Sequence, residues 1–544
     1  MMESLSQSFQ QLLHGDASPV SISCLALAIL IPYYIFVYAK QERISAVPHV
    51  PSILPFVGSG LSYFGAPSKA SVYWRKKYGD VYTMMVFGKT YLKVYRPADV
   101  ESLLRLPEKK GSLAEAYIDL AGKALPQPDT SRKMKDKARE NPKLAALLAP
   151  LQSGTPLIAH SVRPHNLKSW VPDIEEVLQQ QLDALSDSGR FELFAWCQDV
   201  ISCVTVRMML GSKVANDPEL LRTFVDLFFE ADPERGFGTP LGALTTIGEV
   251  AIRGERQIYV KVRELLFQFV DEEIEKCVQR SKSGSAKTDF EEEDSSALAS
   301  MVQQWYHRKL NGSDEDIYYA RTRIANDLFN FTFAAFSNSF GMSAWVLYHY
   351  LLDTKGLQSV LRKELLETPE NKLTNTYPQL EVAILEMARL YTPGDLHRKL
   401  KADWPLPSNP KIVVPKGTVV LASALTTMRD KTRFDKPNEI DWNRDYKKAG
   451  AMFMPFGAGA HPCVGRKFAL LEIALLTAET IRQLDMKLMD PGEVPPTKNN
   501  KEWAKFEGEI LEGIENQPPL DLTQPGFIWR PTIPIMIEYQ KKKI

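Results

Sequence analysis

The sequence predicts a mainly α-helical protein with a minor β-sheet region and an N-terminal transmembrane helix. Three observations support this fold class: residues from about 165 to 400 carry apolar side chains mostly at helical spacing, only short segments alternate as strands do, and residues 20–39 form one uncharged apolar run. The 544 residues are 44% hydrophobic and 24% charged, a composition that supports a large core. We find no internal repeat and expect one large globular fold rather than several domains.

The apolar run at 20–39 is about as long as an α-helix must be to cross a bilayer. A cleaved signal peptide is the alternative, but the run is long for such a peptide, no Lys or Arg precedes it, and it has no clear cleavage site. Lys40 and Arg43 follow the run, so the positive-inside rule predicts that residues 1–19 are lumenal and the rest cytosolic.

A proline-rich linker and a small sheet are expected next. Three prolines at 40–60 fix φ and remove hydrogen-bond donors, so this stretch is predicted to be an extended linker rather than a helix. Residues 79–95 are predicted to form two strands around a glycine turn, and Pro97 then opens a helix.

Amphipathic helices make up the predicted body. A Ser-, Lys- and acid-rich stretch at 281–296 is expected to be a surface loop between them. Residues 326–353 form a long apolar helix in which Asn, Asp and Ser interrupt the apolar surface, so a buried central helix is favoured over a second membrane span. The last 60 residues are predicted to hold proline-rich loops and a strand at 532–540.

Charge and cysteine content exclude several classes of function. Lys and Arg together number 66, as do Asp and Glu, so no net field favours nucleic acid. The five cysteines are widely scattered and lack CxxC or CxxCH spacing, which argues against a disulfide framework, a zinc ribbon and covalent haem attachment. We expect the cysteine-bearing domain to lie in a reducing compartment.

The stretch FMPFGAGAHPCVGRKFALLE, residues 453–472, sets one cysteine in a glycine-rich loop before a helix-like run. Glycine permits turns and close approaches that a Cβ resists, so the loop can lie against a flat or bulky group. Its amides and the positive end of a helix beginning near Arg466 would stabilise a thiolate at Cys463. Such a thiolate can be a nucleophile, a redox thiol or a metal ligand; no CxxC partner supports redox chemistry, and His461 is poorly placed as its base.

The residues Phe456, Gly459, His461, Cys463 and Gly465 are spaced as FxxGx[RH]xCxG. This pattern resembles the haem-binding loop of the cytochrome P450 superfamily, and a chance match is on the order of one in ten thousand. The resemblance, which covers roughly residues 45–544, implies the cytochrome P450 fold, haem b as cofactor and Cys463 as the thiolate ligand of the iron. By position, Phe456 packs beside the sulfur, His461 stands where a basic residue pairs with a haem propionate, and the two glycines shape the turn.

Three further residues resemble the buried Glu-Arg-Arg cluster of that superfamily. Glu386 and Arg389 match its ExxR motif on one helical face, 77 residues before the cysteine, although such a motif alone more often marks a solvated ion pair. Arg444 resembles the arginine that completes the cluster, but the usual Pro-x-Arg-Phe is here Trp-Asn-Arg-Asp. In DLHRKL, Arg398 stands where the family often keeps a propionate-binding base, with His397 as the alternative.

The long apolar helix resembles the one that crosses the distal face of haem in the superfamily. There an acid followed by Thr organises proton delivery to bound oxygen; this chain has Ser337, Asn338 and Ser339 after its small pair of alanines. Because Asn cannot titrate, we expect these catalytic residues to order water that relays protons, or the enzyme to start from an already reduced oxygen substrate. Relatives with Asn here include sterol hydroxylases of bile-acid synthesis and prostacyclin synthase. Alternatively, Asn338 only bonds a neighbouring carbonyl.

Two further sets of residues are weaker candidates. Arg163, His165 and Lys168 stand near the expected C helix, but its propionate-gripping Trp-x-x-x-Arg is missing and a solvated basic face is the simpler interpretation. Phe527 and Ile528 fall near a carboxy-terminal loop that enters the substrate pocket in family members, with a core or membrane contact as the alternative.

The resemblance as a whole implies a haem-thiolate monooxygenase of eukaryotic microsomal type, loosely similar to the sterol hydroxylase and prostacyclin synthase branch. It would cross the endoplasmic reticulum membrane once, with a cytosolic catalytic domain at 61–544, and oxidise a lipophilic sterol, terpenoid or other specialised metabolite with O₂. Nothing in the chain resembles a flavin or nicotinamide domain, so electrons are expected from NADPH-cytochrome P450 reductase. The alternatives are an isomerase or dehydratase that rearranges a peroxide without a reductase, and a non-catalytic haem-binding protein.

Overall fold

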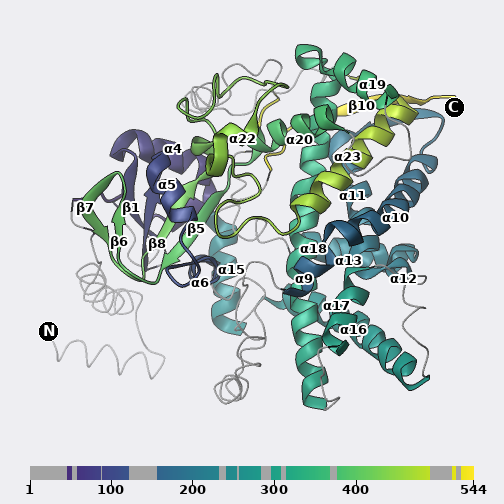
Figure 1. Cartoon of the computed structure of the whole chain (residues 1–544), viewed down its shortest axis with the longest axis horizontal. Helices are drawn as coiled ribbons and strands as arrows, with labels where there is room; N and C mark the ends of the chain where they lie inside the picture. The colour runs from purple at the N-terminus through teal and green to yellow at the C-terminus, as the bar shows by residue number, and fades with distance from the viewer. Residues whose placement is uncertain are drawn as a thin grey trace, which may run out of the picture.

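The computed structural model shows a mostly helical protein with three small β-sheets in its described residues, as the sequence predicts. The helices form the larger body, and the five-stranded sheet lies beside it with α4 and α5 (Figure 1). The expected lumenal segment and membrane anchor, 1–39, lie outside the described residues, as does most of the expected loop at 281–296. The structure describes residues 44, 46–51, 58–86, 88–121, 156–231, 240–253, 256–283, 296–307, 314–367, 377–489, 518–521 and 528–543.

Several helices begin at a proline, whose fixed φ suits the first turn and whose missing N–H has no partner to lose there. The helices are α3 (Gly60–Gly65), α4 (Pro67–Tyr78), α5 (Pro97–Leu104), α6 (Leu113–Ala121), α9 (Pro156–Ser161), α10 (Pro164–Asp183), α11 (Leu193–Leu210), α12 (Ser212–Ala215), α13 (Pro218–Glu230), α15 (Pro240–Arg253), α16 (Gln257–Ser283), α17 (Ala297–His307), α18 (Asp314–Leu351), α19 (Leu357–Glu367), α20 (Pro378–Tyr391), α21 (Ala424–Thr427), α22 (Tyr446–Ala449) and α23 (Arg466–Gln483), with 3₁₀ turns η3 (Thr354–Gly356) and η4 (Gly450–Met452).

The sheets join segments that are far apart in the chain. The largest has the order β1-β2-β8-β5-β3, a second has the order β4-β10-β9, and the third is the pair β6-β7. The strands are β1 (Val81–Val86), β2 (Lys89–Val94), β3 (Gly111–Ser112), β4 (Ser188–Glu192), β5 (Asp395–Leu400), β6 (Trp404–Leu406), β7 (Asn409–Val414), β8 (Val419–Ser423), β9 (Leu484–Leu488) and β10 (Met536–Lys541).

The predicted strands at 79–95 and 532–540 are present as β1, β2 and β10, and α5 follows at Pro97 as expected. The stretch from about 165 to 400 is mainly helical, as predicted, but it also contains two strands, β4 and β5, which pair with β10 and with β8 and β3. Few residues of the expected linker at 40–60 are described, and no helix forms in those that precede Gly60. That stretch lies along β1, where Val50 N–H donates to Thr83 O at 2.8 Å.

Helix α18 is the centre of the helical body, as expected for a buried helix rather than a membrane span. Trp345 is fully buried, stacks on Tyr391 of α20 with ring centroids 4.0 Å apart, and donates from Nε1 to the backbone oxygen of Trp529 at 2.8 Å. Among the described helices, only α11 is long and apolar enough to cross a membrane, and 72% of it is buried inside the protein. Because α11 packs on α18, we interpret it as a core helix.

Candidate functional site

The predicted cysteine loop connects η4 to α23, with Gly465 as the N-cap of the helix. Cys463 N–H donates to the oxygen of Phe456 at 2.7 Å and closes the loop. Gly459 has φ +70°, and a Cβ there would lie 2.0 Å from the oxygen of Leu104 at the end of α5. Only glycine fits this contact, so the loop is held tightly against α5.

The surroundings of the sulfur suit a bound thiolate. Cys463 is exposed on one side. Crowding by neighbouring atoms raises the pKa of its thiol, whereas the backbone N–H groups of Gly465 and Arg466 and the charge of Arg466 lower it. The Arg466 guanidinium lies over the Phe456 ring, 5.6 Å from its centroid. The N-terminal amides of α23 therefore act as hydrogen-bond donors to negative charge on the sulfur.

Helix α18 lies next to this loop. A Cβ on Gly465 would stand 3.5 Å from the ring of Phe331 and 4.0 Å from Cys463 Sγ. One face of α18 therefore borders the cysteine, about two turns before Asn338.

Two predicted propionate-binding residues lie near each other at Glu108. Arg398 on β5 is 1% exposed, donates from Nη1 to His397 O at 2.7 Å, and its Nε makes no hydrogen bond to the described residues. Burial lowers its pKa to about 10, and Glu108 partly opposes this. His461 Nε2 lies 3.1 Å from Glu108 Oε2. Burial, and then the charge of Arg398, lower the pKa of His461, while Glu108 raises it.

His397, the alternative to Arg398, is also buried. Desolvation, assisted by Arg398, lowers its pKa to about 4, so it is neutral at pH 7 and Arg398 is the cation of the pair. A buried guanidinium with an N–H still available is suited to an acidic group of a ligand.

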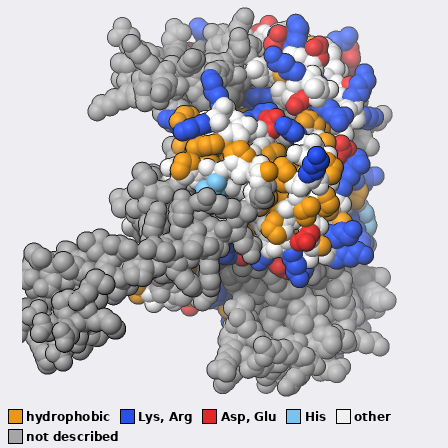
Figure 2. All heavy atoms as spheres, turned by 90° about the vertical axis from the view of Figure 1, so that its left-hand side faces the viewer, with side chains coloured by type: hydrophobic (Ala, Val, Ile, Leu, Met, Phe, Trp, Pro, Cys, Tyr) orange, Lys and Arg blue, Asp and Glu red, His pale blue; other side chains and the backbone are white. Residues whose placement is uncertain are grey.

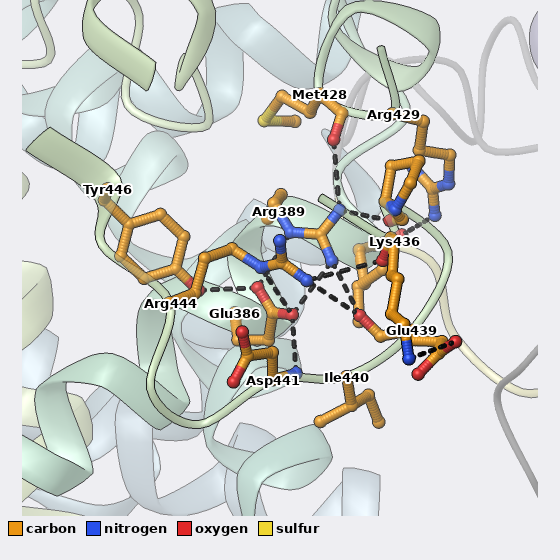
Figure 3. A network of polar contacts seen from close by, with 12 residues as sticks. Glu386, Arg389, Met428, Arg429, Lys436, Glu439, Ile440, Asp441, Arg444 and Tyr446 are labelled. Atoms are coloured by element: carbon orange, nitrogen blue, oxygen red, sulfur yellow. Dashed lines mark hydrogen bonds and ion pairs between the residues drawn. The ribbon is translucent and has the colours of Figure 1, made fainter. Parts of the chain in front are cut away.

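The structure brings Glu386, Arg389 and Arg444 together in a buried network (Figure 3). Arg389 donates to both carboxylate oxygens of Glu386, from Nε at 2.7 Å and from Nη2 at 2.9 Å. Arg444 Nε reaches Glu386 Oε1 at 3.2 Å. Burial raises the pKa of Glu386, but hydrogen bonding and charge from the two arginines outweigh it and hold the pKa below its ordinary value.

The unusual sequence around Arg444 does not disturb the network. Trp442, in place of the family's proline, is buried and donates to Thr354 O at 2.8 Å. Asp445, in place of its phenylalanine, caps α22 through Lys447 N–H at 3.0 Å. The sequence analysis missed Tyr446, whose hydroxyl donates to Glu386 Oε2 at 2.5 Å, because a tyrosine just after the motif carries no distinctive signal.

The polar step on α18, which consists of Ser337, Asn338 and Ser339, makes hydrogen bonds mostly to backbone oxygens of its own helix. Ser337 Oγ donates to Phe333 O at 2.8 Å, and Asn338 Nδ2 lies 3.5 Å from Ala334 O, at the limit of a hydrogen bond. Ser339 is 2% exposed, and its hydroxyl lies near enough to Glu472 of α23 to lower the pKa of that carboxyl group. The Asn338 contact is the one that the alternative interpretation predicts, and its length leaves the amide weakly held.

The sequence analysis also missed Glu472. Its side chain is 1% exposed, and burial raises its pKa to about 8, partly offset by the hydroxyls of Ser339 and Thr205. The signal was present: a lone acid in the apolar run FALLEIALL. An acid on an apolar helical face requires a local explanation.

The structure favours the non-functional interpretation for those of the weaker candidate residues that it describes. Arg163, His165 and Lys168 are all exposed, as a solvated basic face requires. Ile528 is 1% exposed and packs against α18, where a Cβ on Gly341 would meet its Cγ2 at 2.4 Å, so it is a core contact. Phe527 lies outside the described residues.

Comparisons with known proteins identify the family of the chain. The cytochrome P450 family model matches residues 48–509, so the chain belongs to that family. Sterol 14-alpha demethylase cyp51A of Aspergillus fumigatus is 23% identical over 481 residues, 81% of this chain and 86% of that protein. Cytochrome P450 7B1 of Mus musculus is 23% identical over 510 residues, 87% and 92% of the two chains. The structure of retinoic acid bound cyanobacterial CYP120A1 matches with a TM-score of 0.63 and 16% identity, over 92% of this chain and 100% of that one.

Membership of the family makes the protein a cytochrome P450 monooxygenase with haem b as cofactor. The described residues fit that group. Cys463 has two amide donors at its sulfur, Phe456 is 8% exposed beside it, and Arg398 offers a buried cationic N–H for a propionate. Among these residues, Glu108 fits a haem propionate poorly, because its own carboxylate already lies beside His461.

Proposed function

We propose that this protein is a membrane-anchored monooxygenase that hydroxylates or otherwise oxidises a lipophilic small molecule, such as a sterol or terpenoid. Haem b held by Cys463 would supply the oxidising chemistry with O₂. Electrons would come from NADPH-cytochrome P450 reductase. The observation that carries the proposal is the Cys463 loop, which combines an accessible sulfur with amide donors and a position beside α18.

The chain's own residues have separate roles in this proposal. Cys463 holds the iron, and the N–H groups of Gly465 and Arg466 stabilise the charge on its sulfur. Arg398 and His461 bind propionates. Ser337, Asn338 and Ser339 hold water and pass protons on α18, while Glu386, Arg389 and Arg444 keep the segment after β8 in place.

Exposed cations around the cysteine loop support a separate electron donor. Arg466 and Lys467 open α23 directly after the loop, and both are exposed. Trp170 of α10 packs edge-on against Phe468 with ring centroids 5.5 Å apart, and the exposed Lys168 stands two residues before Trp170 in α10. Such a basic surface attracts an acidic flavoprotein, and the association should weaken with salt.

A lipophilic substrate is supported by the sterol-metabolising relatives and by the apolar surface of α18. Membrane attachment is supported by the 20-residue apolar run at 20–39. In this proposal the protein lies in the endoplasmic reticulum membrane, with residues 1–19 in the lumen. Residues 40–60 are then a linker, and residues 61–544 form the cytosolic catalytic domain. The side of the molecule that carries β7 and α4 shows apolar side chains among Lys and Arg (Figure 2). Val413 of β7 is 49% exposed and Tyr73 of α4 is 58% exposed, as a surface close to lipid permits.

The test is a metabolite comparison in cells that express the chain with and without its reductase. We expect a new oxidised lipophilic product only when both are present, and none from Cys463→Ser. Purified wild-type protein should show the thiolate-type carbon monoxide difference spectrum, and Cys463→Ser should lose it. An unchanged spectrum in that variant would overturn the assignment of the iron ligand.

A haem-thiolate isomerase or dehydratase is the second candidate, and Asn338 favours it. The side chain at that position cannot titrate, and Ser337 stands where the family has an acid, so α18 itself offers no proton source. Such an enzyme would convert a lipid peroxide without NADPH or reductase. Product formation from a peroxide alone supports this candidate, and strict NADPH dependence rejects it.

A further inference from the structure

Helix α18 lacks an acid at its polar step, yet the structure brings a carboxyl group to it from another helix. We propose that Glu472 of α23 holds the proton for the step Ser337–Ser339, acting as a positioning residue through the hydroxyl of Ser339. The inference deepens the proposed function and rests on it.

The placement of Glu472 is the first argument. It lies in the second turn of α23, where α23 packs on α18 and α11. The side chain is 1% exposed, and neither carboxylate oxygen makes a hydrogen bond of good geometry to the described residues. Two hydroxyls act on it: Ser339 of α18, which is 2% exposed, and Thr205 of α11, which is fully buried.

The protonation state follows from this burial. A carboxylate removed from water without a cation or a full set of donors is strongly disfavoured, so the group binds a proton instead. Burial raises the pKa of Glu472 to about 8, and the only other influences on it are the two hydroxyls. No charged side chain of α10, α11, α18, α20 or α23 acts on it within the described residues. At pH 7 the residue is mainly a neutral acid with one O–H to donate.

No other titratable group of the described α18 serves this step. Asp327 and His349 each lie 11 residues from Asn338, about 16 Å along the helix. Asp327 is paired with Arg323 at 2.9 Å, and His349 contacts Tyr391 Oη at 2.9 Å. Ser337 is committed to Phe333 O. Within the described residues, Glu472 is a titratable side chain that does interact with this segment, through Ser339.

The proton step is balanced within these groups and water. Glu472 gives its proton to Ser339 Oγ while that hydroxyl releases its own proton toward water held by Asn338. One O–H bond breaks and one forms at the serine, and the carboxyl group becomes a carboxylate. The carboxylate then recovers a proton from bulk water. Its return to the neutral form is favoured because the buried anion is unstable.

Infrared spectroscopy of the purified full-length protein tests the first part without any need for turnover. We expect a carbonyl band of a protonated carboxyl group that disappears with an apparent pKa near 8 and is missing in Glu472→Gln. Ser339→Ala and Thr205→Val should both move this pKa upward, because each hydroxyl lowers it in the wild type. A band that is absent at pH 6, or unmoved by Ser339→Ala, overturns the inference.

The fraction of electrons that end in product tests the proton transfer through Ser339, and it distinguishes the role of the Ser339 hydroxyl from that of Thr205. With purified reductase and NADPH, the measurement is the fraction of electrons released as hydrogen peroxide across pH 6–9. We expect Glu472→Gln and Ser339→Ala to raise this fraction several-fold and to lose its pH dependence, and Glu472→Asp to recover part of it. Thr205→Val should keep the wild-type fraction at low pH, with its pH dependence moved to higher pH. Equal effects of Ser339→Ala and Thr205→Val would show a structural role and overturn the inference.

The carbon monoxide spectrum keeps this test distinct from that of the proposed function. If wild-type protein lacks the thiolate-type spectrum, the proposed function fails while the infrared result still reports on Glu472. If the spectrum is normal in every variant and the infrared band is insensitive to pH, only the inference about Glu472 fails.

Discussion

The substitution Glu386→Gln tests how much the buried cluster contributes to stability. The side chains of Glu386 and Arg389 are fully buried and that of Arg444 is 7% exposed, so the variant leaves two guanidinium groups facing each other without an anion. Removing one partner of a buried ion pair costs about 3–5 kcal/mol. The arginines keep some backbone acceptors, such as Met428 O for Arg389 at 3.0 Å, so we expect a loss of about 4 kcal/mol.

The assay is urea unfolding of the detergent-solubilised full-length protein, followed by tryptophan fluorescence and by haem absorbance. Glu101→Gln is the matched control, because Glu101 pairs with Arg105 at 2.6 Å on the surface. An exposed pair contributes about 0.2–1 kcal/mol, so the control should unfold almost as wild type does. A loss below about 1 kcal/mol in Glu386→Gln would refute the reasoning that the buried charges depend on one another.

The same cluster gives a pH dependence with a definite sign. Although burial raises the pKa of Glu386, the arginines bring it below its ordinary value of 4.5, so the cluster's stabilisation is complete above that value. It is lost as the pH falls through the folded pKa. In Glu386→Gln this part of the acid sensitivity should disappear, which unfolding curves between pH 3 and 6 would show.

Three further predictions follow from single contacts. Gly459→Ala should fail to retain haem or lose more than about 2 kcal/mol of stability, because its Cβ would overlap Leu104 O at a positive φ. The control Gly248→Ala in α15, where nothing lies near the added Cβ, should fold normally. Thermal unfolding of the two variants makes the comparison. Arg398→Gln should release haem to apomyoglobin about tenfold faster with its carbon monoxide spectrum unchanged. The pKa of Glu472 is raised from 4.5 to about 8, so its contribution to folding stability is present at low pH and is lost as the pH rises between these two values. Glu472→Gln has no such loss. Over this pH range its free energy of unfolding, measured by urea unfolding, should therefore rise relative to that of wild type by up to about 1.4 kcal/mol per pH unit.

Local patterns in the sequence were sufficient for much of the fold. The alternation at 79–95, the helical spacing of α10, α16 and α19, and the interrupted apolar run of α18 all depend on neighbours within a few residues, so they are readable from a single chain. The sequence did not reveal β4 or β5, two short segments that are extended because strands distant in the chain flank them. Pairing partners distant in the chain leave no local trace.

In the candidate site, too, some features follow from the sequence and others only from the tertiary structure. The Cys463 loop is a contiguous motif in which glycine positions are imposed by close contacts, and the sequence therefore determined it, together with the family. Tertiary structure alone decided that Tyr446 reaches Glu386, that Glu108 lies beside His461, and that the buried Glu472 of α23 lies near Ser339 of α18. The physical reason is that burial and the approach of side chains from different helices set the charge state of these groups, and neither is encoded by spacing along the chain.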